Sequence, residues 1–196
     1  AVFGMGIDEV RVRHSRKKNL NSKGLALLPD GQGWLYVEFG AGTTAEAEAQ
    51  AMQLMARLES RPGAPSMRLF RDPVETQHVW AVRESALGAT SFVPGEAKNW
   101  EGWEDAAVPP ARLGEYLRRL RRLMGEFHYT GSLYGHFGQG CVHTRINFDL
   151  KTAEGIALYR RFVEEASDLV VELGGSISGE HGDGQSRGEL LPRMYS

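Results

Sequence analysis

Two glycine-rich stretches hold the residues best suited to chemistry. The first is residues 135–143 (GHFGQGCVH) and the second is residues 178–184 (SGEHGDG). In both, histidine or glutamate stands near glycines, where the backbone turns sharply and a ligand can approach closely. Imidazole nitrogens and carboxylate oxygens ligate metals, and histidine also transfers protons near neutral pH. The two stretches therefore predict a site for metal binding and proton transfer.

The first stretch is expected to form a β-hairpin with its turn at residues 138–141, because apolar and polar residues alternate on both sides. If Phe137 pairs with Val142, then His136 lies directly opposite His143 on the same face. Opposed residues have Cβ atoms about 4.5–5.5 Å apart. Two imidazoles at that spacing can hold one cation about 2.0–2.1 Å from each nitrogen.

Glu180 is expected to complete a three-ligand site with His136 and His143, and His181 stands beside it as a proton acceptor. The competing interpretation is that these are ordinary polar residues of strands and loops. Two histidines in cross-strand register, together with a glycine-flanked Glu-His pair, favour the metal site. Cys141 is a possible soft ligand, but in this register it points away from His143 or into the loop, which favours a small turn residue.

At these residues the chain resembles the C-terminal, substrate-binding domain of FAD-linked oxidases. That group contains D-lactate dehydrogenase, D-2-hydroxyglutarate dehydrogenase and the glycolate oxidase flavin subunit. The family pattern is close to Gly-His-x-Gly-Asp-Gly-Asn-x-His-x-Asn, followed later by Gly/Ala-Glu-His-Gly. The resemblance covers residues 34–196. Gln139 replaces the Asp of the pattern, Cys141 its first Asn and Arg145 its last Asn.

The resemblance implies that His136, His143 and Glu180 hold a divalent metal, zinc or manganese, and that His181 is the catalytic base. It also implies oxidation of a 2-hydroxy acid to a 2-oxo acid, with the hydride passing to FAD. The FAD is then held mainly by a separate N-terminal domain that this chain lacks, so the isolated chain is expected to be inactive. An iron–sulfur domain or subunit is a candidate electron-transfer partner.

Three basic residues are candidates for binding the substrate. Arg83 matches the arginine of the family's Leu-Arg-Glu, and Lys98 lies fifteen residues later, where the family carries a lysine. Arginine offers a carboxylate a bidentate fork and lysine a point charge. Arg145 shares the strand face of His143, and its charge needs an anion. Either a protein carboxylate, Glu104 or Asp105, supplies that anion, or the substrate does. In the second case the sequence predicts a larger or dianionic 2-hydroxy acid in preference to lactate.

Two other classes of function fit part of the pattern. A hydrolase could use a His-His-Glu zinc and its bound water. However, the zincin His-Glu-x-x-His pattern is absent, and the family resemblance extends beyond the three ligands. A non-catalytic module that docks another subunit is the second alternative. Metal binding separates both enzymes from the module, and dependence on flavin separates the dehydrogenase from the hydrolase.

Composition narrows the class of protein. The 196 residues are 41% hydrophobic and 24% charged, with a net charge of −2, which is typical of a globular domain and gives no reason to expect nucleic acid as a partner. No apolar run approaches the roughly 20 residues of a membrane span. The single cysteine fits a reducing cytoplasm, and peripheral attachment to a membrane would then come through an electron-accepting partner.

The fold class expected from the order of elements is α+β, an antiparallel sheet with helices packed on one face, and the resemblance implies a ferredoxin-like unit with extensions. Residues 1–33 are expected to be a basic segment, solvated and mobile over 8–20 or in contact with a missing domain. Residues 34–196 are expected to form the substrate- and metal-binding domain. Strands are predicted at 34–39, 67–70, 104–108 and 176–178 besides the hairpin, and helices at 43–61, 73–84, 112–127 and 152–173. The remaining run, 87–110, is a long loop and a candidate for lining the site.

Overall fold

The computed structural model describes residues 3–85, 93–95 and 97–195. Within them a five-stranded sheet has the order β2-β1-β4-β5-β3. All its pairings are antiparallel. The strands are β1 (Phe3–Asp8), β2 (Gly33–Glu38), β3 (Ala106–Ala107), β4 (Gly131–Gly135) and β5 (Cys141–Ile146). The antiparallel sheet and the α+β class are confirmed.

Seven α-helices accompany the sheet in the described residues: α1 (Glu9–Lys17), α2 (Ser22–Leu27), α3 (Thr44–Glu59), α4 (Pro73–Glu84), α6 (Leu113–Glu126), α7 (Ala153–Glu172) and the short α8 (Gly184–Arg187). A six-residue 3-10 helix follows at Gly188–Arg193. Three of the helices predicted from sequence begin with a side-chain cap, as expected for the first two. Thr43 forms a capping box with Glu46, Asp72 precedes Pro73 at the start of α4, and Thr152 caps α7.

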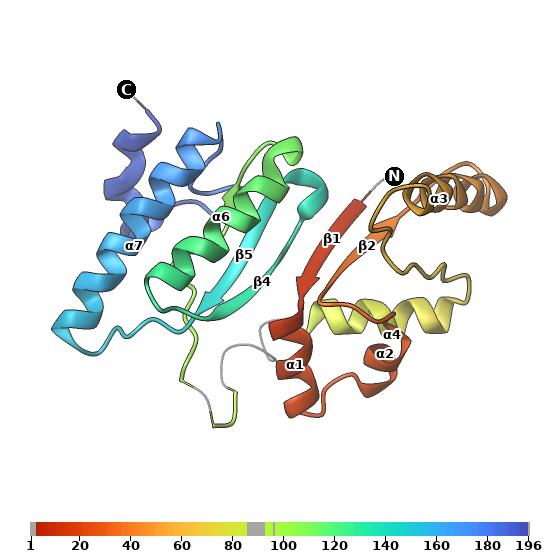
Figure 1. The fold of residues 1–196 in the computed structure, drawn as a ribbon, viewed down its shortest axis with the longest axis horizontal. Helices are drawn as coiled ribbons and strands as arrows, with labels where there is room; N and C mark the ends of the chain where they lie inside the picture. The colour runs from red at the N-terminus through yellow and green to blue at the C-terminus, as the bar shows by residue number, and fades with distance from the viewer. Residues whose placement is uncertain (1–2, 86–92, 96, 196) are drawn as a thin grey trace.

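Helices cover both faces of the sheet, where one face was expected. Leu133 of β4 belongs to the main core with residues of α6 and α7. Its neighbour Tyr134 packs with Ile7, Val12 and Val82 in a second cluster. Because adjacent strand residues point to opposite faces, the two clusters lie on opposite sides. In Figure 1, α6 and α7 lie over the β4-β5 half, while α1, α2 and α4 gather at the β1-β2 end.

The expectation of a mobile N-terminal segment is wrong for the described residues. Phe3–Asp8 is an inner strand of the sheet, paired to β2 on one side and β4 on the other. Arg11 and His14 of α1 are fully buried despite their charge or polarity. Asp8 caps α1 and also accepts a hydrogen bond from the Leu133 amide at 2.7 Å. The folded body therefore begins well before residue 34.

Two other predictions of local structure need correction. Residues 67–70 do not form a paired strand, although the apolar residues Met67, Leu69 and Phe70 suggested one. Residues 176–178 contribute only a single bridge, from Ser176 to Ala107. Within the described residues neither segment pairs with a strand long enough to make a ladder, which strand propensity alone does not reveal. Part of the long loop, residues 86–92 and 96, lies outside the described residues.

None of the helices in the described part of the chain combines the length and the apolar character that crossing a lipid bilayer requires.

Candidate metal and acid–base site

The β4-β5 hairpin forms as predicted, but its register is shifted by two residues. Tyr134, not His136, lies opposite His143. The strand ends at Gly135 because residues 137–139 form a 3-10 turn, which brings the Cys141 amide to the His136 carbonyl at 3.1 Å. The ring of Phe137 lies directly over Gly6 of β1, where any Cβ would collide with it. The alternation pattern could not show this contact, because Gly6 is more than a hundred residues away.

A shift of two residues keeps every side chain on its original face. His136 and His143 therefore still approach each other, with ring centroids 5.5 Å apart in an edge-to-face arrangement. The two glycines that bracket the turn allow this geometry. Gly135 has φ +148° and Gly140 has φ +79°, and a Cβ on Gly140 would lie 1.8 Å from the Val108 carbonyl oxygen.

The structure brings four sequence-predicted residues together. Glu180 Oε1 lies 3.0 Å from His143 Nε2 and 3.3 Å from His136 Nε2. The same oxygen is 3.5 Å from His181 Nε2, and the His181 ring stacks on His143 with centroids 5.1 Å apart. We call these four residues the histidine–glutamate cluster. Its members come from the hairpin and from a loop almost forty residues later.

Asp105 holds that later loop in place. Its Oδ2 accepts hydrogen bonds from Ser178 Oγ at 2.6 Å, the Glu180 amide at 2.9 Å and the His181 amide at 2.7 Å. Burial would raise the pKa of Asp105, but these hydrogen bonds outweigh burial and lower it to about 2. Asp105 is completely buried and has a positive φ of 74°, a strained conformation for a residue with a Cβ.

Glu104 and Asp105 are site residues to which sequence reasoning gave no fixed role. The only signal was their place in the long loop, together with the need of Arg145 for an anion. Glu104 supplies that anion, since its Oε2 pairs with Arg145 Nη1. Its other oxygen, Oε1, lies 3.0 Å from His181 Nδ1. The C-terminal part of the loop therefore lines the site, as predicted.

Cys141 lies on the same face as His143, contrary to prediction, because β5 begins at Cys141 and alternate residues share a face. Its Sγ is 3.3 Å from Asp105 Oδ1. Burial, followed by the nearby Asp105 carboxylate, raises the pKa of the Cys141 thiol. The thiol donates a hydrogen bond to Asp105, which favours its protonated form.

Two candidate substrate residues lie apart from the cluster. Arg83 is at the end of α4 beside Arg11, and Tyr134 lies between Arg11 and His143. Lys98 lies over the ring of Trp100, with Nζ 3.7 Å from its centroid. Trp100 forms a β-bridge with Ile146. Ile146 is three residues past His143, so along the strand the bridge lies about 10 Å from the cluster.

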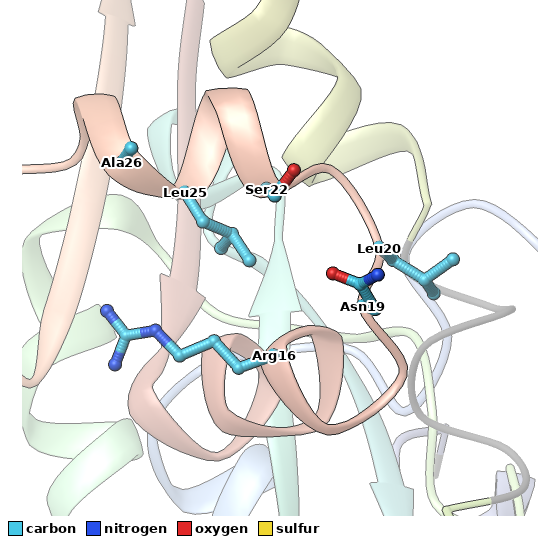
Figure 2. A pocket seen from close by; sticks show the side chains of 6 residues that line it. All are labelled: Arg16, Asn19, Leu20, Ser22, Leu25 and Ala26. Carbon is cyan, nitrogen blue, oxygen red and sulfur yellow. The ribbon is translucent and has the colours of Figure 1, made fainter.

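The cluster lies on an open surface. The side chains of Glu180 and His181 are 44% and 48% exposed. A hollow of about 270 Å³ lies elsewhere, between α1 and α2, lined by Arg16, Asn19, Leu20, Ser22, Leu25 and Ala26. In Figure 2 its Leu25 points from α2 toward α1, on which Arg16 lies. A second hollow is lined by residues of and just before α4. Neither hollow includes a residue of the cluster.

The chain matches the family of FAD linked oxidases, C-terminal domain, over residues 7–196, and it belongs to that family. The match extends the resemblance seen in the sequence to include α1 and α2, in agreement with the folded N-terminal part of the chain.

Individual relatives fall within the same group. The chain is 28% identical to a D-2-hydroxyglutarate dehydrogenase of Pantoea ananatis over 87% of this chain and 17% of the relative. It is 30% identical to glycolate oxidase subunit GlcD of Escherichia coli over 65% of this chain and 25% of the relative. A D-lactate dehydrogenase of Archaeoglobus fulgidus is 39% identical over 46% of this chain and 21% of the relative. The chain thus matches no more than a quarter of the length of these relatives.

Replacing Asp105 by Asn should loosen the loop at 178–182, because an amide cannot accept three N–H or O–H donors and a thiol as a carboxylate does. We expect a loss of about 2–3 kcal/mol in the free energy of unfolding at pH 7, measured in urea. The pKa of Asp105 is lowered in the folded state, so its stabilisation is complete above the unfolded pKa of about 3.9 and is lost as pH falls toward about 2.

In Asp105→Asn, the free energy of unfolding should lack the part that the wild type loses on acidification toward about pH 2. Asp72→Asn, at the exposed cap of α4, is the matched control and should cost no more than about 1 kcal/mol. Equal unfolding midpoints for Asp105→Asn and the wild type would contradict the role given to Asp105.

Proposed function

We propose that this chain is the substrate- and metal-binding part of an FAD-dependent dehydrogenase that oxidises a 2-hydroxy acid to a 2-oxo acid. The observation that supports this most directly is the convergence of His136, His143 and Glu180, with His181 beside them, in a chain of the FAD-linked oxidase family. The relatives' names supply the substrate class, since they are dehydrogenases or oxidases of 2-hydroxyglutarate, glycolate and lactate.

The donor types suit a divalent metal, and His143 and Glu180 belong to a group of side chains whose possible ligand atoms all lie within 4.8 Å of one another, whereas His136 belongs to no such group among the described residues. Two ligands about 2.05 Å from a tetrahedral zinc ion lie about 3.3 Å apart, and Glu180 Oε1 lies 3.3 Å and 3.0 Å from the two Nε2 atoms. Burial lowers the pKa of His143, in spite of the nearby carboxylates, which favours the neutral imidazole that binds metals. Nitrogen and oxygen donors suit zinc or manganese. Bound there, the metal would supply a Lewis acid that lowers the pKa of the substrate hydroxyl.

The chain's own residues bind the substrate and move its proton. His181 Nε2 accepts the hydroxyl proton while Nδ1 faces Glu104. Arg83 and Lys98 are the proposed partners of the substrate's carboxylate oxygens. Among the described residues Arg145 Nε has no hydrogen-bond partner, and this donor is the proposed contact of Arg145 with a second acidic group on the substrate. FAD, bound mainly by another domain, would supply the acceptor for the hydrogen on the α-carbon.

The open surface of the cluster agrees with substrate binding by this chain and FAD binding by another domain, because hydrogen transfer to a flavin requires a second protein surface over the substrate. An iron–sulfur domain or subunit is the proposed electron acceptor, and the cytoplasm, with peripheral membrane contact through that acceptor, is the proposed location. A metallohydrolase would use the same ligands, but membership in a flavoprotein family favours the dehydrogenase.

The 196-residue chain should bind one equivalent of Zn²⁺ in calorimetry at pH 7.5. His143→Ala and Glu180→Ala should each weaken binding by more than about 100-fold, since each removes a ligand. Cys141→Ser should leave affinity unchanged, and His128→Asn is the control because His128 is exposed. Equal affinity for the wild type and both ligand variants would place the metal elsewhere.

In the complete, FAD-loaded protein, His181→Ala should slow reduction of the flavin by 2-hydroxy acid by about 10²–10⁴-fold, the usual contribution of a general base. The loss of flavin absorbance is followed by stopped flow, and metal content is measured in the same sample to show that the site is intact. A wild-type protein whose flavin no 2-hydroxy acid reduces would overturn the proposed function.

Arg145→Asn in the complete protein should lower kcat/KM for 2-hydroxyglutarate relative to lactate by about 10-fold or more, because the guanidinium pairs with the second carboxylate. Arg122→Asn, on the exposed side of α6, controls for the loss of a positive charge. If Arg145→Asn changes the ratio by less than about threefold, or ~0.65 kcal/mol, Arg145 does not read the substrate.

A further inference from the structure

Glu104 connects two residues of the site that come from different elements. Its Oε1 lies 3.0 Å from His181 Nδ1, and its Oε2 pairs with Arg145 Nη1. Only 18% of the Glu104 side chain is exposed. Its backbone carbonyl accepts a hydrogen bond from Arg187, whose other Nη donates to the Gly182 carbonyl at 3.1 Å. Both the backbone and the carboxylate of Glu104 are thus fixed against the loop that carries His181.

The contact with Glu104 determines how His181 presents its ring. A carboxylate at Nδ1 favours the tautomer in which Nδ1 carries the proton and donates it. The unprotonated Nε2 then faces the cluster, where Glu180 Oε1 lies 3.5 Å away. Stacking on His143, with an angle of 9° between the rings, restrains the plane of the imidazole. Stacking alone permits a flip that exchanges the two nitrogens, and the hydrogen bond to Glu104 opposes that flip.

Glu104 does more than neutralise the charge of Arg145. A carboxylate whose only partner is a guanidinium commonly binds it through both oxygens. Here one oxygen is directed to Arg145 and the other to His181. Arg145 in turn holds the carboxylate from the side opposite His181, so that Glu104 cannot swing away into solvent at little cost.

We propose that Glu104 is a positioning residue for the base. It holds His181 as the Nδ1–H tautomer with Nε2 directed at the substrate hydroxyl, and it faces the imidazolium after proton transfer. The same logic operates wherever a carboxylate orients a histidine base. This inference rests on the proposed function for its kinetic consequence, but the tautomer it assigns to His181 is a property of the chain itself.

The test uses Glu104→Gln, Glu104→Asp and the control Glu101→Gln, which alters an exposed glutamate of the same loop. Glutamine has a single acceptor oxygen and cannot serve His181 and Arg145 together, whereas aspartate keeps both oxygens. The tautomer of His181 is read from histidine ¹⁵N shifts in the chain at pH 8, where imidazoles are neutral, with His181→Ala identifying the resonances. Flavin reduction is measured in the complete protein, and zinc content in both.

We expect one Nδ1–H tautomer in the wild type and a mixture in Glu104→Gln. We also expect kcat for flavin reduction to fall about 10²-fold in Glu104→Gln. KM and the ratio between lactate and 2-hydroxyglutarate should stay within about threefold, and Glu104→Asp should recover at least about 10-fold of the lost kcat. Glu101→Gln should match the wild type in every measurement.

An unchanged tautomer together with unchanged kcat in Glu104→Gln would overturn the proposal. Loss of zinc in that variant would also overturn it, because Glu104 would then be a metal ligand alongside His143 and His181, a grouping that the distances permit. If no 2-hydroxy acid reduces the wild-type flavin, the proposed function fails, while the ¹⁵N shifts still decide whether Glu104 orients His181.

Discussion

The site depends on one buried carboxylate. Asp105 collects three hydrogen bonds from residues 178–181 on a single oxygen and a fourth, from Cys141, on the other. Residues 178–182 belong to no helix or strand of their own, so the ordinary ladders of secondary structure do not hold them. Without Asp105 the exposed side chains of Glu180 and His181 would sample many positions, and their meeting with the hairpin histidines would cost conformational entropy.

The two faces of the sheet differ in polarity, and the polar groups of the site lie on one of them. On one face β4 and β5 pack Leu133, Val142 and Ile146 against α6 and α7 in the main core. The opposite face of the same strands presents Tyr134, His143 and Arg145. Of the helices on that face, α1 lies against β1 and β4, while α2 and α4 gather at the β1-β2 end. Much of the polar face of β4 and β5 is consequently left for the chain's own loops.

Within the proposed enzyme this arrangement separates two tasks. In that proposal the chain supplies nitrogen and oxygen donors for a cation and a proton acceptor on one sheet face, and basic side chains for carboxylates. Its relatives are four or more times longer than the matched stretch, which agrees with redox chemistry being carried by other parts of the protein. A rigid hairpin joined to a loop by Asp105 and Glu104 fixes the acid–base groups before any other domain docks.

The sequence by itself determined the residue types, the hairpin, the family and most helices, because these follow from local spacing, caps and glycine placement. His136, His143, Glu180 and His181 could be grouped since each stands in a short motif. Three features were decided only by tertiary structure. Phe137 set the register by packing on Gly6, β1 took its inner place by pairing on both edges, and Glu104 and Asp105 joined the site through contacts more than thirty residues away in sequence. Such contacts leave no periodicity in the chain, because they depend on which distant surfaces meet when the core closes.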